Sequence, residues 1–173
     1  MTYYEALTEA MTMLGQQSST IFLGQSVAYP GQAMHKSLNF VPLNKRLEFP
    51  VAEDFQMGYS IGLALAGKLP ISIYPRMDFL ILALNQLVNH LDKAEEMNWP
   101  LPKVIIRVAV GALSPINAGP QHTQDHTQAL ACMLRSVRVR SLFRAEQVIP
   151  AYESALRRPE STLLVEYAQE YYK

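Results

Sequence analysis

Apolar residues along this chain follow two alternating patterns, short runs typical of buried strands and longer stretches with helical spacing. The clearest run, 104–110, is almost entirely β-branched or small, which is typical of a strand buried on both faces of a parallel sheet. Shorter apolar runs bounded by turn residues predict five further strands, at 20–23, 46–49, 70–74, 137–142 and 162–165.

Between these runs, apolar residues recur every three or four positions, which predicts helices. The first helix begins at a capping box formed by Thr2 and Glu5 and ends at Gly15. The segment 25–44 follows neither pattern and is interpreted as a mobile surface loop with a helical turn near 34–38. Further helices are predicted at 58–67, from Asp78 to about Met97, at 124–134 and at 145–156.

The regular alternation of strands and helices predicts the fold class. We expect residues 1–173 to form a single α/β domain with three layers, in which a mostly parallel sheet carries helices on both faces. A chain of 173 residues is long enough to bury a core of this kind.

Three segments directly follow predicted strands, at 50–55, 74–79 and 111–122. In an open parallel sheet, ligands bind beyond the carboxyl ends of the strands, so these segments are candidates for a site. They contribute the carboxylate of Glu53, the ring of Phe79 and the imidazole of His122. A structural interpretation stays open for each: a carboxylate favoured by the helix dipole, a ring in a helix core and a loop histidine bonded to backbone.

Charge and composition exclude several classes of partner. The chain has 15 basic and 15 acidic side chains, which gives no electrostatic basis for binding nucleic acid or an anionic membrane. No apolar run approaches the roughly 18 residues of a membrane span, and the first residues do not resemble a signal peptide. The single cysteine, Cys132, is expected to be buried and inert. Because one cysteine allows no intramolecular disulfide, the sequence agrees with a reducing compartment, and we expect a cytoplasmic location.

Sequence motifs for several familiar sites are absent. The chain contains no G-x-G-x-x-G, no P-loop and no G-x-S-x-G elbow. His122 and His126 are four residues apart and could share a helical face, as zinc ligands sometimes do. No cysteine or carboxylate with ligand spacing joins them, so no metal site is predicted in this chain.

The order of the segments resembles a known family once its short motifs are considered. Residues 49–53 match a Pro-x-x-Glu signature, and the small residues between 58 and 70 fit the helix and turn after it. Residues 119–124 match a Gly-Pro-Gln-His-Ser-Gln loop. In this order and spacing, the chain resembles the N-terminal, pyrimidine-binding domain of the β subunits of thiamine-diphosphate-dependent 2-oxo acid dehydrogenases and, more distantly, of transketolases.

This resemblance implies roles for the three candidate residues. Glu53 would hydrogen-bond the ring nitrogen of the aminopyrimidine of thiamine diphosphate and activate the cofactor, a role that suits a carboxyl group shielded from water. Phe79 would pack on the pyrimidine ring, and His122 would contact the substrate. The implied chemistry is decarboxylation, acyl transfer or ketol transfer from a 2-oxo acid or ketose, and the substrate itself stays open.

Departures from the family pattern imply a partner. The Gly-Asp-Gly and distant Asn-Asn that hold diphosphate and Mg²⁺ are absent, as is a C-terminal transketolase-type domain. The expected partner is therefore an α-like subunit carrying that half, and the expected assembly is a heterotetramer or a homodimer of this chain. Gln25 and Ser26 stand where an acidic pair is usual, residues 112–118 replace a Gly-rich loop, and no potassium site is predicted. The alternative is a non-catalytic or regulatory homologue that binds the partner without turnover.

Overall fold

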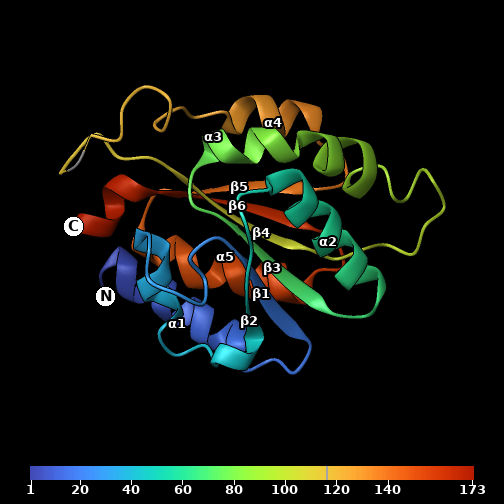
Figure 1. Ribbon diagram of the computed structural model, residues 1–173, viewed down its shortest axis with the longest axis horizontal. Helices are drawn as coiled ribbons and strands as arrows, with labels where there is room; N and C mark the ends of the chain where they lie inside the picture. Colours follow the sequence, from blue (N-terminus) through green and yellow to red (C-terminus); the bar gives the residue numbers. More distant parts are fainter. Residues whose placement is uncertain (116) are drawn as a thin grey trace.

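The computed structural model describes residues 1–115 and 117–173 and confirms the three-layer α/β fold. One six-stranded sheet has the order β2-β1-β3-β4-β6-β5, and every pair of neighbouring strands is parallel (Figure 1). The strands are β1 (Thr20–Gly24), β2 (Arg46–Glu48), β3 (Leu69–Tyr74), β4 (Ile105–Val110), β5 (Arg138–Leu142) and β6 (Thr162–Tyr167).

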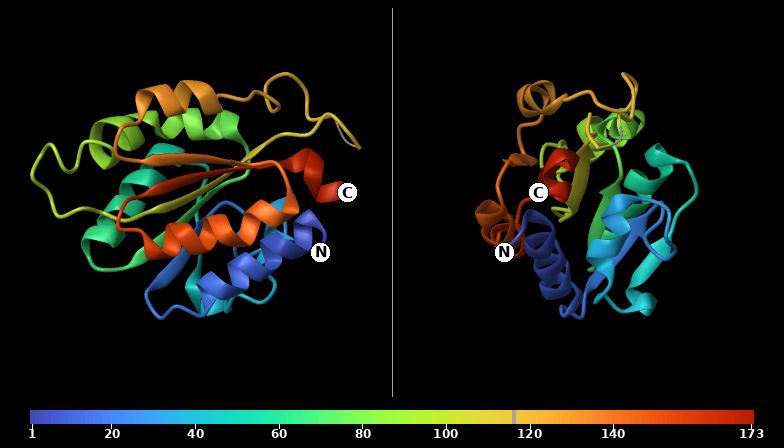
Figure 2. Two further views of the ribbon diagram at one scale, coloured as in Figure 1. Left: turned by 180° about the vertical axis from the view of Figure 1, so that it is seen from behind. Right: turned by 90° about the vertical axis from the view of Figure 1, so that its left-hand side faces the viewer.

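Two long helices cover one face of the sheet. Figure 2 shows α1 (Tyr3–Gly15) and α5 (Ala145–Arg157) side by side on this face. The short helices η1 (Ala33–Leu38) and η5 (Ala168–Tyr172) contribute residues to the same core. The predicted capping box is present, since Thr2 accepts from the Glu5 N–H and Glu5 accepts from the Thr2 N–H. Side chains such as Leu7 and Leu14 are fully buried there against sheet residues that include Ile105.

The opposite face carries α2 (Glu53–Leu65), α3 (Met77–Leu80), η3 (Ile81–Ala83), η4 (Asn85–Leu91) and α4 (Thr127–Met133). Their buried residues pack against Ile106, Val108 and Val110 of β4, which alternate with the residues facing α1 and α5. Both faces of β4 are therefore buried, as the unbroken apolar run predicted.

A buried polar network lies between the sheet and the α1–α5 layer. Arg107 and Glu166 are fully buried and pair through two hydrogen bonds, of 2.5 Å and 2.9 Å. The hydroxyls of Tyr152 and Tyr171 donate to the Glu166 carboxylate at 2.6 Å and 2.5 Å, and Arg107 donates to Ser37 Oγ at 2.8 Å. A buried ion pair is tolerated because each charged group is satisfied in this way.

The long helix predicted from Asp78 to Met97 is wrong in both its start and its form. The helical segment begins at Met77, with Arg76 at the N-cap, and changes from α to 3₁₀ and then to π geometry before ending at Leu91. Asp92, only 1% exposed, instead accepts from the backbone N–H groups of residues 135–137. This tertiary contact fixes the backbone directly before β5.

Two other predictions about helices need correction. The helix predicted from residue 58 begins five residues earlier, at Glu53, while the helix predicted from residue 124 begins only at Thr127. Cys132 is exposed, not buried, because short α4 turns only Leu130 fully into the core. Within the described residues, we find no helix with the length and apolar character needed to span a bilayer.

Candidate active site

The direction of the connections changes between β1 and β3, two adjacent strands in the middle of the sheet. From β1 the chain moves to β2 on one side, whereas from β3 it moves to β4 on the other. The carboxyl ends of two such strands border a crevice, which is where α/β proteins of this type bind ligands. Glu53 begins α2, the helix that connects β2 to β3 and so crosses beside this point.

Glu53 is only 3% exposed and has a specific partner at the end of β1. The Gln25 side chain donates from Nε2 to Glu53 Oε1 at 2.8 Å. Gln32, at the start of η1, donates in turn from its Nε2 to the Gln25 carbonyl at 3.3 Å. The carboxylate is therefore held at the first turn of its helix by a side chain from a different strand end.

The loop after β1 is shaped by the carboxylate of Glu48, at the end of β2. Glu48 accepts backbone N–H groups of Ser26, Val27 and Ala28 at 2.5, 2.9 and 2.8 Å. Ser26 has a φ of 53°, a left-handed conformation that these bonds help to maintain. Glu48 thus fixes the backbone immediately after Gln25.

A second buried polar cluster lies under the start of α2. Gln56 donates from Nε2 to Ser72 Oγ at 3.1 Å and to the Ile73 carbonyl at 3.0 Å. Gly24, with a φ of 150°, allows this packing, because a Cβ there would lie 2.3 Å from the Ile73 carbonyl oxygen. Burial raises the pKa of the Tyr74 phenol above its usual value, and the Glu53 carboxylate adds to this effect, so Tyr74 stays neutral.

Phe79 and His122 are in direct contact. Phe79 lies in α3 just after β3, and its ring meets the His122 imidazole edge to face, with centroids 5.4 Å apart and planes at 69°. His122 lies in the loop after β4, where its backbone N–H donates to the Gly119 carbonyl at 3.1 Å. Its Nδ1 is buried and has no hydrogen-bond partner among the described residues.

The position of His122 depends on a glycine at the end of β4. A Cβ on Gly111 would lie 1.8 Å from the His122 carbonyl oxygen, so only glycine lets the returning loop pack this closely. The loop after β4 is therefore folded back on its own strand end. One of its positions, Ile116, lies outside the described residues.

The structure brings some of the candidate residues together and leaves others apart. Phe79 contacts His122, and Glu53 contacts Gln25, but no described hydrogen bond or ring contact joins Glu53 to the other two. The suggestion that His122 and His126 share a helical face is wrong, because His122 lies in a loop and His126 is the N-cap of α4. Among the described residues, no group of three His, Cys, Asp or Glu side chains is placed to hold a metal ion.

Comparisons with known proteins agree with this architecture. A pyruvate dehydrogenase E1 component subunit beta from Cyanidium caldarium is 31% identical over 141 residues, which cover 78% of this chain and 41% of that protein. The mitochondrial subunit of the same name from Saccharomyces cerevisiae is 26% identical over 172 residues, covering 96% of this chain and 46% of that protein. The resemblance to thiamine-diphosphate-dependent β subunits is confirmed.

A solved structure extends the likeness to transketolases at the level of the fold. The structure described as a split gene transketolase, inactive β4 tetramer, superimposes with a TM-score of 0.70 at 20% identity and covers 94% of this chain and 50% of that one. No protein-family model matches the chain. The chain spans less than half the length of the β subunits it matches.

The sequence patterns missed the two residues that support Glu53. In the sequence, Gln25 was only a departure from an acidic pair that is usual in the family, and Glu48 was only part of a short predicted strand. Their roles depend on the adjacency of β1 and β2 and on the register that pairs Gly24 with Glu48. The only feature of the sequence that could have indicated this role of Glu48 was a carboxylate at the end of a short strand.

Proposed function

We propose that this chain forms the pyrimidine-binding half of a thiamine-diphosphate-dependent enzyme that acts on a 2-oxo acid or ketose. The observation that carries the proposal is the buried Glu53 carboxylate beside the carboxyl ends of β1 and β3, in a chain similar to thiamine-diphosphate-dependent β subunits. The residues present suit the cofactor's aminopyrimidine, since they offer a shielded carboxyl group, a half-buried aromatic ring and an imidazole whose buried Nδ1 has no described partner.

Each residue has a separate task in this proposal. When bound, thiamine diphosphate supplies the carbon nucleophile and electron sink for cleavage next to a carbonyl group. Glu53 hydrogen-bonds the ring nitrogen of the aminopyrimidine and shares a proton with it, while Gln25 keeps the carboxylate in place. Phe79 packs on the ring and orients the His122 imidazole toward the substrate.

We further propose that an α-like subunit binds beside α2 and supplies the diphosphate and Mg²⁺ site. A cavity of about 530 Å³ along α2 is lined by two glycines, two aromatic rings, one leucine and two polar side chains, namely Gly58, Gly62, Phe55, Tyr59, Leu63, Asp54 and Gln86. Phe55 and Tyr59 are 59% and 41% exposed although their rings pack with each other and with Phe49. Exposed aromatic side chains beside glycines provide a surface on which a partner helix can approach closely.

Reconstitution tests the proposal. The chain would be co-expressed with an α-like subunit that carries the Gly-Asp-Gly and Asn-Asn motif, and turnover would be measured with thiamine diphosphate and Mg²⁺. Glu53→Gln should assemble normally and lose at least about a hundredfold in turnover, the typical contribution of general acid–base catalysis. The matched control is Glu146→Gln, which removes an exposed carboxylate from the first turn of α5.

One sequence feature favours the alternative of a non-catalytic homologue. Residues 112–118 replace the Gly-rich loop of the family, and exposed Leu113 follows half-buried Gly111 and buried Ala112 there. The alternative predicts a stable complex with the α-like subunit, no turnover with any 2-oxo acid or ketose, and identical partner binding by Glu53→Gln and the unmodified chain. Turnover that disappears in Glu53→Gln would exclude it.

A further inference from the structure

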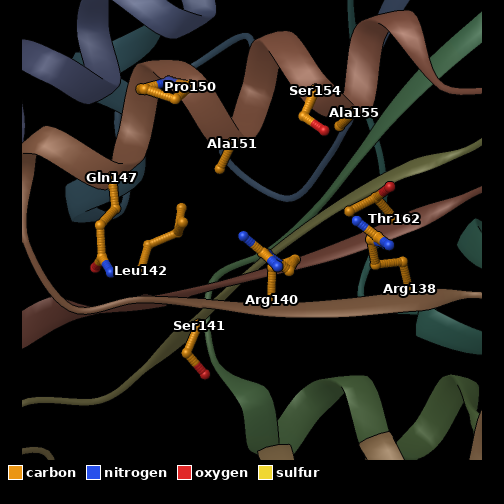
Figure 3. Close-up of a pocket in the computed structure, with 10 residues that line it drawn as sticks. All are labelled: Arg138, Arg140, Ser141, Leu142, Gln147, Pro150, Ala151, Ser154, Ala155 and Thr162. Atoms are coloured by element: carbon orange, nitrogen blue, oxygen red, sulfur yellow. The ribbon is translucent and has the colours of Figure 1, made fainter.

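A second cavity lies between β5 and α5, at the opposite edge of the sheet from β2 and the start of α2. Its volume is about 260 Å³, and its lining combines two arginines, Arg138 and Arg140, with the polar side chains of Gln147, Ser154 and Thr162 (Figure 3). No acidic side chain is found among the described residues that line it. The sequence patterns gave no indication of this site.

Strand periodicity explains why two arginines meet here. Successive side chains of a strand point to opposite faces, so Arg138 and Arg140 share the face that looks toward α5, while Val139 packs on the other face. Figure 3 shows both guanidinium groups on the α5 side of β5, with the side chains of Gln147 and Ser154 coming from the helix. The two planar donor groups therefore border one cavity, which is open to solvent on the side of the exposed Arg140.

The positive charge of this space is poorly compensated. Arg140 has no carboxylate within ion-pair distance among the described residues. Arg138 approaches only Glu160, at 3.9 Å, and the same Glu160 oxygen lies closer to Arg158, at 3.2 Å. An arginine pair with only this one distant, shared carboxylate over a small cavity favours a bound anion.

Neutral donors also line the cavity, beside apolar side chains such as Leu142 and Ala151. Thr162 is 2% exposed, and its hydroxyl has no hydrogen-bond partner among the described residues, which is unusual for a buried polar group. The Gln147 Oε1 accepts the N–H groups of Phe143 and Arg144, which leaves its amide N–H groups available. Ser154 Oγ accepts from Arg158 Nε at 3.2 Å and retains its own proton as a donor.

We propose that this cavity binds a small phosphate-type oxyanion, either inorganic phosphate or the phosphate group of a small monoester. Arginine forks match the oxygen geometry of phosphate, and hydroxyl and amide donors satisfy the remaining oxygens. Arg140 and Arg138 hold the anion from the strand, Thr162 from the neighbouring strand, and Gln147 and Ser154 from the helix. This site is independent of the proposed thiamine-diphosphate chemistry.

Calorimetric titration of the full chain with inorganic phosphate, at constant ionic strength set by chloride, tests the site. Saturable binding with one equivalent is expected. Arg140→Ala should weaken it by at least about tenfold, because a charge-assisted bidentate contact is lost. Arg140→Lys keeps the charge without the planar fork, so its affinity for phosphate should fall between those of the unmodified chain and Arg140→Ala. Arg157→Ala, on the exposed side of α5 and outside the lining, is the matched control and should bind as the unmodified chain does.

Two further measurements keep the outcome decisive. Glycerol phosphate is titrated in parallel: equal affinity identifies the inorganic ion as sufficient, and tighter binding identifies a monoester. Circular dichroism confirms that each variant is folded, and Thr162→Val supplies a second, charge-neutral test that should also weaken binding. The proposal is overturned if phosphate gives no more heat than chloride, or if Arg140→Ala and Arg157→Ala weaken binding equally.

Discussion

Gln25 and Glu53 are joined by a hydrogen bond of 2.8 Å from the amide Nε2 to the carboxylate Oε1. The two residues are separated by the whole of the loop after β1 and by β2, and they meet because β1 and β2 are neighbouring parallel strands. An amide cannot share its proton in the way a second carboxyl group can. Gln25 therefore acts on Glu53 as a fixed donor, in a place where the family usually has an acidic residue.

The first prediction concerns this hydrogen bond. Under the proposed function, Gln25→Ala should lower turnover in the reconstituted complex by about ten- to a hundredfold, since a hydrogen bond to a charged group contributes roughly 1.5–3 kcal/mol. Binding of the α-like subunit should not change. The control is Gln128→Ala, at an exposed position of α4. Unchanged turnover in Gln25→Ala would show that Glu53 does not depend on this donor.

The second prediction concerns the glycine that admits the His122 loop. Gly111→Ala places a methyl group where the His122 carbonyl oxygen lies, so the loop must shift. We expect the free energy of unfolding to fall by about 1–3 kcal/mol, the usual effect of overpacking, and the Phe79–His122 contact to be lost. Urea unfolding and the NMR signals of the His122 ring measure the two effects. A variant with both unchanged would contradict the close approach.

The third prediction separates stability from partner binding at α2. Gly62 lies inside the helix with open space where a Cβ would be, so Gly62→Ala should stabilise the isolated chain by up to about 1 kcal/mol. The same methyl group enters the proposed partner surface and should weaken assembly with the α-like subunit. Glu9→Ala, at an exposed position of α1, is the control for helix propensity alone. If Gly62→Ala binds the α-like subunit as tightly as the unmodified chain does, the partner binds at a different surface.

The fourth prediction follows from the network around Glu166. Burial, and then the Glu166 carboxylate, raise the pKa of Tyr152 and of Tyr171 well above the ordinary value of 10.0. The native state therefore keeps protons that the unfolded chain loses above pH 10. This stabilising contribution is complete below pH 10 and decreases as the pH rises further, by about 1.4 kcal/mol per pH unit for each retained proton.

Urea unfolding between pH 9 and 11.5 measures this dependence. Tyr152→Phe should reduce the slope above pH 10 and lower the free energy of unfolding at pH 8 by about 1–3 kcal/mol, because Glu166 loses a buried donor. Tyr29→Phe, at a residue that is 69% exposed, is the matched control. A Tyr152→Phe slope equal to that of the unmodified chain would show that this tyrosine ionises in the native state.

Predictions from local pattern succeeded where burial alone decides the structure. The β-branched run at 104–110 became β4, buried on both faces, and the capping box at Thr2 and Glu5 formed as expected. The helix start at Asp78 and the burial of Cys132 were predicted wrongly, because Arg76 is the N-cap and short α4 turns only Leu130 into the core. Helical spacing continues past Leu91, but the Asp92 carboxylate binds the backbone before β5, and no periodicity records a contact over more than forty residues.

The sequence by itself determined the layers of this protein and the three strand ends that carry Glu53, Phe79 and His122, because apolar periodicity reports which faces are buried. Only the tertiary structure decided what those residues touch. The Gln25–Glu53 bond, the approach of Gly111 to His122 and the arginine-lined cavity beside α5 each join segments far apart along the chain. Such contacts depend on strand order and register, which set the distances between side chains that a linear pattern does not contain.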